Sequence, residues 1–157
     1  MSRKGQKKKR AVSPDPKYNS IQIERFTTKL MERGKKNLAR NIVYGALEVL
    51  EKESGQKAPE ALDVVIRNAS PQIEVKSKRV GGATYQVPVE VRGERRQTLA
   101  MRWLIESARV KKGKNMAEKL GQEFALAHKN QGDAISKKDS VHKQAEANKA
   151  FAHLARY

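Results

Sequence analysis

The spacing of hydrophobic residues has a helical period along most of this chain and a strand period in one stretch only. Helical spacing covers residues 20–31, 38–50, 59–69, 94–110, 116–127 and 136–152. Between residues 73 and 91, apolar and polar residues alternate on both sides of Gly81 and Gly82, which is typical of two strands joined by a tight turn. The sequence therefore predicts a mostly α fold, a bundle of about six helices with one protruding β-hairpin between the third and fourth helices.

The same spacing predicts which side chains face the core. In the second helix one apolar face is shared by Leu38, Ile42, Val43, Ala46, Leu47 and Leu50. Phe26, Phe124 and Phe151 each lie on an apolar stripe, so we expect all three in the core. For Tyr85 and Trp103, packing in the core is favoured over stacking on a base.

Residues at the expected helix ends support these boundaries. Pro59 suits the first turn of the third helix, and Asn115 with Glu118 forms a capping pair before the fifth. Ser136 or Ser140 is expected to cap the last helix. Because a lone two-stranded hairpin is only marginally stable in water, we expect the hairpin to project and to rest on a partner.

Length and composition bound the domain organisation and the class of protein. A chain of 157 residues fits a single helical domain over residues 18–157, preceded by a basic arm, residues 1–17, that is expected to be disordered until bound. The absence of Cys excludes disulfides and thiolate metal sites. Since no apolar run approaches the ~20 residues of a membrane span and no secretory signal is present, we expect a soluble intracellular protein.

Positive charge is the strongest indication of a binding partner. The chain has 34 Lys and Arg residues against 17 Asp and Glu residues, a net charge of +17, and most of the excess lies in residues 1–17 and 76–114. Charge of one sign destabilises a compact chain by self-repulsion unless an anion neutralises it. Nucleic acid is the expected anion, and a membrane surface is the weaker alternative.

Motifs of catalysis and of cofactor binding are absent from the sequence. There is no phosphate-binding Gly-x-x-x-x-Gly-Lys loop, no Gly-x-Ser-x-Gly elbow and no His-Glu-x-x-His pair. His142 follows Asp139 by three residues, but a histidine on a helix surface or facing RNA is far commoner than a catalytic pair of this kind. Met101 and Met116 are expected to pack rather than to bind metal. We therefore expect a protein that is not an enzyme and has no cofactor and no metal site.

The balance of basic and aromatic residues indicates which kind of nucleic acid is bound. Aromatic residues make up only 5% of the chain, too few for a protein that stacks single-stranded bases. Many phosphate donors with few rings favour folded RNA or a duplex recognised by its shape. Two alternatives stay open: an architectural DNA-binding protein with a β-ribbon arm and, less favoured, an RNA-modifying enzyme.

Long stretches of the sequence resemble one protein family. Residues 75–91, VKSKRVGGATYQVPVEV, and 98–104, TLAMRWL, are similar to the hairpin and the next helix of ribosomal protein seven of the small subunit, bacterial and organellar type. Residues 34–36 with 42–47 resemble its second-helix block, and residues 145–153 resemble its ending. The resemblance covers nearly the whole chain.

The resemblance implies a helical body with a protruding hairpin and a role as a structural constituent of the small ribosomal subunit. Members of the family bind small-subunit ribosomal RNA at a multi-helix junction in its three-prime major domain and nucleate assembly of the head. They lie near the messenger RNA and the exit-site transfer RNA and contact small-subunit ribosomal proteins nine and eleven, with one copy per subunit. The implied location is the ribosome in the cytoplasm, with an organellar matrix or stroma as the alternative.

The resemblance also implies which residues bind the ribosomal RNA, all of them basic except one methionine. They are Arg3, Lys4, Lys7, Lys8, Lys9, Arg10, Lys35, Lys36, Lys76, Lys78, Arg79, Arg92, Arg95, Arg96, Arg102, Arg109, Lys114 and Met116. The sequence departs from the family pattern at Gly93, at Gln144 and in residues 154–157. These departures weaken the expectation that the C-terminus reaches the exit-site transfer RNA or the messenger, and they leave RNA binding untouched.

Overall fold

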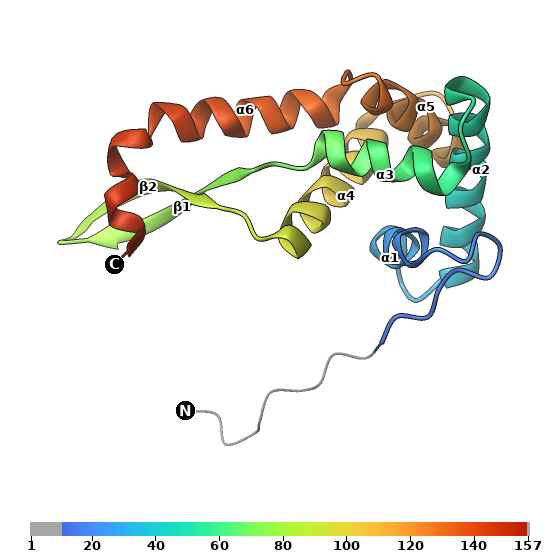
Figure 1. Cartoon of the computed structure of the whole chain (residues 1–157), viewed down its shortest axis with the longest axis horizontal. Helices are drawn as coiled ribbons and strands as arrows, with labels where there is room; N and C mark the ends of the chain where they lie inside the picture. The colour runs from blue at the N-terminus through green and yellow to red at the C-terminus, as the bar shows by residue number, and fades with distance from the viewer. Residues whose placement is uncertain (1–10, 157) are drawn as a thin grey trace.

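The computed structural model describes residues 11–156, and the six basic residues predicted to bind RNA within residues 3–10 lie outside that range. The elements are α1 (Ile21–Leu30), α2 (Lys36–Ser54), α3 (Ala58–Ala69), β1 (Ile73–Val80), β2 (Ala83–Glu90), α4 (Gly93–Val110), α5 (Met116–His128), α6 (Asp133–Ala147) and the 3₁₀ helix η1 (Lys149–Arg156). Helices α1 to α5 form a body from which the two strands project, with α6 running alongside them (Figure 1). The predicted fold class, a mostly α bundle with a hairpin between the third and fourth helices, is confirmed.

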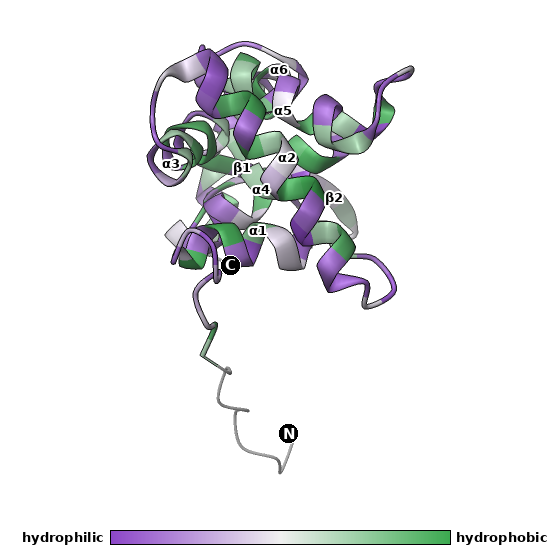
Figure 2. Ribbon diagram, turned by 90° about the vertical axis from the view of Figure 1, so that its right-hand side faces the viewer, coloured by the Kyte–Doolittle hydropathy of each residue, from purple (hydrophilic) through white to green (hydrophobic). Residues whose placement is uncertain are grey.

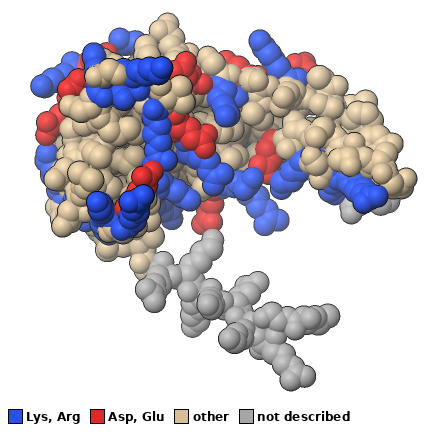
Figure 3. Space-filling view, turned by 180° about the vertical axis from the view of Figure 1, so that it is seen from behind, with Lys and Arg blue, Asp and Glu red and all other residues tan. Residues whose placement is uncertain are grey.

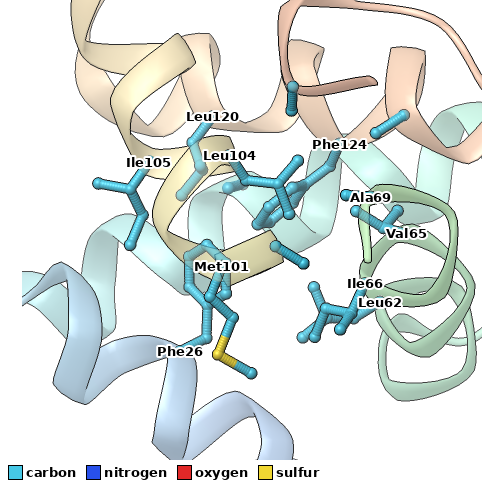
Figure 4. Close-up of a cluster of buried hydrophobic side chains, with 14 of the residues drawn as sticks. Phe26, Leu62, Val65, Ile66, Ala69, Met101, Leu104, Ile105, Leu120 and Phe124 are labelled. Atoms are coloured by element: carbon cyan, nitrogen blue, oxygen red, sulfur yellow. The ribbon is translucent and has the colours of Figure 1, made fainter. Parts of the chain in front are cut away.

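The core of the body is built from the apolar faces of α1 to α5 and from the first turn of α6. Leu47 and Leu120 are completely buried, and Phe26 meets Phe124 edge to face with ring centroids 5.2 Å apart. Figure 4 shows these aromatic rings converging from different helices, and Figure 2 shows hydrophobic segments gathered where the helices meet. Trp103 is also buried in this core, as predicted.

Helices α2 and α5 approach each other closely because both carry glycine at their contact. A Cβ atom on Gly121 would lie only 2.7 Å from the Cβ atom of Val49, and one on Gly45 would lie 3.1 Å from that of Ala117. A larger side chain at position 121 would therefore push the helices apart. The contact fixes where the N-terminal end of α2 lies relative to the start of α5.

Leu38 does not face the core, so the prediction from its spacing was wrong. Its side chain is 56% exposed, whereas Val43 and Leu47 of the same stripe are completely buried. Gly45 of α2 lies against Ala117, the second residue of α5, so α5 begins well beyond the first turn of α2. Periodicity defines the apolar face of a helix, but it does not show how far the neighbouring helix extends along that face.

The hairpin is a regular antiparallel pair. Its strands stay in register from the base to the tip, where Val80 pairs with Ala83. Gly81 and Gly82 close the tip with φ values of 57° and 88°, the left-handed conformation that a tight two-residue turn requires. The predicted hairpin around this glycine pair is therefore confirmed.

The hairpin rests partly on the chain's own C-terminal segment, η1, which crosses it (Figure 1). Tyr85 packs on Phe151 with ring centroids 5.2 Å apart and ring planes inclined at 48°. Lys78 Nζ donates to the carbonyls of Leu154 and Ala155 at 3.3 and 3.1 Å. Tyr85 and Phe151 are half-buried here and lie outside the core, contrary to prediction, because α6 ends before Phe151 and η1 turns toward the strands.

Helix α6 begins at an earlier position than its sequence predicts. Neither Ser136 nor Ser140 caps it; Gly132 occupies the N-cap position, and Ser136 Oγ donates to the Gly132 carbonyl at 3.1 Å. The backbone N–H of Ala134 instead donates to the buried carboxylate of Glu123, in α5, at 2.9 Å. The predicted cap was wrong because a residue on another helix accepts from the backbone N–H that has no partner within the helix at this end.

Two other predicted helix starts are confirmed. The Asn115 side chain accepts a hydrogen bond from the Glu118 backbone N–H at 2.8 Å and donates to the Glu118 carboxylate at 2.7 Å. Pro59 lies in the first turn of α3. In both cases the residues that mark the helix start lie within one short segment, so the sequence alone was sufficient to predict where the helix begins.

A buried aspartate holds the chain just before α1. The Asp15 carboxylate accepts hydrogen bonds from the backbone N–H groups of Lys17 and Tyr18 at 3.0 and 3.2 Å. The hydroxyl of Tyr44, in α2, donates to the same carboxylate at 2.8 Å, and burial together with this bond raises the pKa of Tyr44. These contacts fix the point at which the N-terminal segment joins the helical body.

Candidate nucleic-acid interface

Several of the predicted RNA-binding residues are exposed cations whose side chains have no partner among residues 11–156. They are Lys35, Arg79, Arg92, Arg102 and Lys114. They come from the α1–α2 loop, the end of β1, the connection between β2 and α4, the middle of α4 and the α4–α5 loop. An unpaired guanidinium or ammonium group keeps its full capacity for charge-assisted hydrogen bonds, so these side chains are the most available to phosphates.

The other predicted cations already have partners within the chain. Lys36 contacts Glu24, Lys76 and Arg95 contact Glu74, Arg109 contacts Glu32, Arg96 donates to the Val91 carbonyl, and Lys78 donates to the carbonyls near the C-terminus. Such contacts orient the elements that carry the unpaired cations. The charges still add to the positive potential of the surface.

Glu74 joins the base of the hairpin to α4. Its carboxylate accepts from Arg95 Nε at 2.8 and 3.0 Å and from Arg95 Nη2 at 2.8 Å, and Lys76 Nζ lies 3.0 Å away. Burial acts to raise the pKa of Glu74, but the hydrogen bonds and charges of Arg95 and Lys76 outweigh it and bring the pKa below its usual range. The carboxylate is therefore ionised at neutral pH and holds two cations on the hairpin base.

Burial at the hairpin base runs against the simple alternation of the strand. Glu74 is only 8% exposed, whereas its apolar neighbour Ile73 is 37% exposed. Strand alternation alone would place the isoleucine inside. The glutamate is buried instead because Arg95 supplies the charge partner that a buried carboxylate needs.

Basic residues of α1 were missed by the sequence reasoning. Arg25 and Lys29 are exposed and line a groove of about 530 Å³ between α1 and α4. Lys29 also shares a second groove with Arg102 and Arg109. The signal was present in the sequence, since Arg25 and Lys29 are four residues apart within the first predicted helix and so lie along one helix face.

The fold brings together three predicted residues that are distant in the sequence. Lys35, Arg109 and Met116 line one groove of about 320 Å³ where the α1–α2 loop meets the end of α4 and the start of α5. Arg79 does not join them, because it lies at the far end of the hairpin. Lys and Arg side chains extend along the lower edge of the molecule in Figure 3, from the helical body to the hairpin.

The basic loop between α4 and α5 is anchored by a buried carboxylate. Glu123 of α5 is completely buried, and Lys111 of the loop forms an ion pair with it. The second oxygen of Glu123 accepts from Ala134 at the start of α6. The pair therefore holds the loop that presents Lys114 and ties it to α6.

Catalytic and metal-binding arrangements are not found among residues 11–156. No three His, Asp or Glu side chains in this range are grouped so that they could hold a metal ion. The His142 ring accepts a hydrogen bond from the Gln72 backbone N–H at 3.1 Å, so it is held by the start of the hairpin rather than by Asp139. None of the helices described has the length and apolar character needed to cross a membrane.

Unpaired cations on a helical body and a basic hairpin are typical of a nucleic-acid-binding protein. The sequence model of one family, described as ribosomal protein S7p/S5e, matches residues 2–149. The chain belongs to this family, so the resemblance found in its sequence is confirmed.

Individual members of the family are similar over their whole length. The chain is 53% identical to the small ribosomal subunit protein uS7 of Chloroflexus aggregans over 156 residues, 99% of each chain. It is 50% identical to the uS7 protein of Roseiflexus castenholzii over 157 residues, 100% of each chain. With the uS7 protein of Nitrosococcus oceani it shares 52% identity over 153 residues, 98% of each chain.

Proposed function

We propose that this chain is a structural, non-enzymatic constituent of the small ribosomal subunit that binds the ribosomal RNA of that subunit directly. The observation that carries the proposal is the family match over residues 2–149, together with similarity to named small-subunit proteins over the full length. A protein with this role works in the ribosome. The architectural DNA-binding alternative draws no support from these relatives.

The distribution of charge explains how binding would proceed. The unpaired side chains of Lys35, Arg79, Arg92, Arg102 and Lys114 would bind phosphates. Phosphate contacts fix register and orientation, whereas sequence is read elsewhere, so the spacing of these cations would recognise the shape of a folded RNA. The paired cations would add positive potential, and the basic residues of the arm, residues 1–17, would contribute further contacts.

Finer assignments follow from the family resemblance and belong to the same proposal. The expected binding site is the multi-helix junction in the three-prime major domain, where the protein would nucleate assembly of the head with residues 18–157 as its single RNA-binding domain. The hairpin and the last helix would lie near the messenger and the exit-site transfer RNA. Small-subunit ribosomal proteins nine and eleven would be its protein neighbours, with one copy of the chain per subunit.

Salt dependence and footprinting of the RNA complex test this function. Binding of the full chain to a three-prime major domain fragment should weaken linearly with the logarithm of salt, with a slope of about −0.7 to −0.9 per phosphate neutralised. Footprinting should show protection confined to the junction, and excess duplex DNA should not displace the protein. An affinity independent of salt, or equal affinity for duplex DNA, would contradict the proposal.

A matched pair of variants locates the interface on the body. Lys35 and Lys52 are exposed lysines at opposite ends of α2, and only Lys35 lies beside the predicted RNA-binding groove. Lys35→Gln should weaken RNA binding and lower the salt slope by about 1, whereas Lys52→Gln should change neither. Equal effects of the two variants would place the RNA elsewhere on the surface.

A further inference from the structure

The groove that contains Lys35, Arg109 and Met116 has an apolar floor, which phosphate binding alone does not require. Leu38, Ile42 and Met116 line it together with the cations, and its volume of about 320 Å³ is at the lower end of the roughly 300–1,000 Å³ typical of small-molecule sites. The Leu38 side chain is 56% exposed there. An apolar residue displayed in a polycationic surface indicates a ligand with both an apolar and an anionic part.

Three cations line the same groove. Arg33 and Lys35 come from the α1–α2 loop, and Arg109 comes from the last turn of α4. The one acidic side chain lining the groove is Glu32, whose Oε1 atom lies 2.5 Å from Nη2 of Arg109. Both side chains are well exposed, at 69% for Glu32 and 45% for Arg109, so this ion pair can exchange for another anion at little cost.

We propose that the groove binds one unstacked base of the ribosomal RNA, and that a phosphate of the same strand replaces Glu32 as the partner of Arg109. The inference rests on the proposed function and specifies what this site takes. RNA supplies both halves of the required ligand, because unpaired bases in loops and bulges can leave the helix and present an apolar face beside a phosphate. A guanidinium also binds phosphate in a bidentate geometry, which favours the exchange.

The fold keeps this groove open for a ligand. Because α5 begins beyond the first turn of α2, Leu38 has no neighbouring helix to cover it, and Met116 forms the edge where that helix starts. The close contact at Gly121 and Val49 holds the two helices at this offset. Three positive side chains against one negative one favour an RNA strand over a protein segment as the occupant.

Leu38→Ser tests the apolar half of the site. In the complex of the full chain with the three-prime major domain fragment, base-specific chemical probing should show one unpaired nucleotide that the wild-type protein protects and the variant leaves reactive. The remaining footprint should be unchanged, and the affinity should fall about three- to tenfold. Leu126→Ser, which alters a leucine that is 37% exposed at the far end of α5, is the matched control and should leave that nucleotide protected.

Glu32→Gln tests the exchange of anions at Arg109. Removing the competing carboxylate should tighten RNA binding about two- to fivefold, whereas a merely structural role of Glu32 would leave the affinity unchanged or lower it.

Failure of this inference is distinct from failure of the proposed function. If the wild-type protein and Leu38→Ser bind the fragment equally and protect the same nucleotides, the groove takes no base although the protein binds RNA. If the wild-type protein does not bind the fragment, the proposed function itself is wrong.

Discussion

The helical body and the hairpin are held together by different kinds of contact. In the body, apolar side chains such as Leu47 and Phe124 are fully buried between the packed helices. In the hairpin, Val87 is buried, but the contacts that fix its position are the Glu74–Arg95 ion pair at its base and the Tyr85–Phe151 ring contact with η1. Hydrophobic burial stabilises the first region, whereas a few polar and aromatic contacts position the second.

The difference shows how one small chain can combine a stably packed helical body with a hairpin whose tip is available to a ligand. A projecting two-stranded ribbon cannot bury a core of its own, so it depends on the segments that lie against it. Among the residues that the structure describes, none is paired with the Arg79 side chain or lies against the two turn glycines, so the tip is available to a ligand. The body in turn supplies the folding stability that the basic hairpin and the groove beside Lys35 both require.

The largest effect should come from the body. Leu47→Ala deletes a completely buried side chain and should lower the free energy of unfolding by about 2–5 kcal/mol, measured by denaturant titration of the full chain. The matched variant Leu38→Ala lies on the same helix but is 56% exposed, and it should change stability by less than about 0.5 kcal/mol. Equal losses would mean that the two ends of α2 are packed alike.

A charge reversal at the hairpin tip should affect binding and not folding. Arg79→Glu should weaken binding to the RNA fragment about tenfold, equivalent to about 1.4 kcal/mol, with an unchanged unfolding midpoint. Lys52→Glu, on an exposed part of the body, is the control for net charge. Lys78→Glu is a less specific probe, because Lys78 also bonds to the carbonyls of Leu154 and Ala155 and its loss should loosen the hairpin as well.

Loss of the contact between the hairpin and η1 should destabilise the hairpin and leave the helical body unaffected. Tyr85→Ala removes an aromatic pair, which is worth about 0.5–1.5 kcal/mol beyond its buried area. Hydrogen exchange should become faster in the amides of both strands and stay unchanged in α2 and α5. Faster exchange throughout the body would show that hairpin and body unfold as one unit, which would remove the distinction drawn between them.

The smallest effect should be a dependence on acid at the hairpin base. The folded-state pKa of Glu74 lies below its unfolded value of about 4.3, so the ion pair stabilises the protein above that pH, and the contribution is lost as the pH falls through the folded pKa. Glu74→Gln should therefore unfold with a weaker pH dependence below about pH 4.3, while the difference between the two proteins is constant near neutrality. A pH dependence identical to that of the wild-type chain would show that the pair contributes nothing.

Much of the fold was predictable because its signals are local. The periods of the helices, the turn glycines Gly81 and Gly82 and the Asn115 cap all act within a few residues, and the structure follows them. The failures share one cause. Leu38, Phe151 and the start of α6 depend on where a distant helix begins or ends, which no local pattern records.

The candidate RNA-binding surface also has features that the sequence could predict and features that it could not. Its chemistry was predictable, since the excess of Lys and Arg over Asp and Glu is a property of composition. Which cations are paired was not predictable, because Glu32 meets Arg109 and Glu74 meets Arg95 across long gaps in the sequence. The spacing of Arg25 and Lys29 was visible in the sequence, but its importance depends on α4 lying beside α1.

The sequence by itself determined the helices, the hairpin and the need for an anionic partner, because periodicity, turn conformation and net charge are set by neighbouring residues or by simple composition. Only the tertiary structure decided which of the cations stay free and where an apolar floor opens beneath them. Both depend on the offset between helices, and this offset is fixed by contacts such as that of Gly121 with Val49, between residues that lie far apart in the chain.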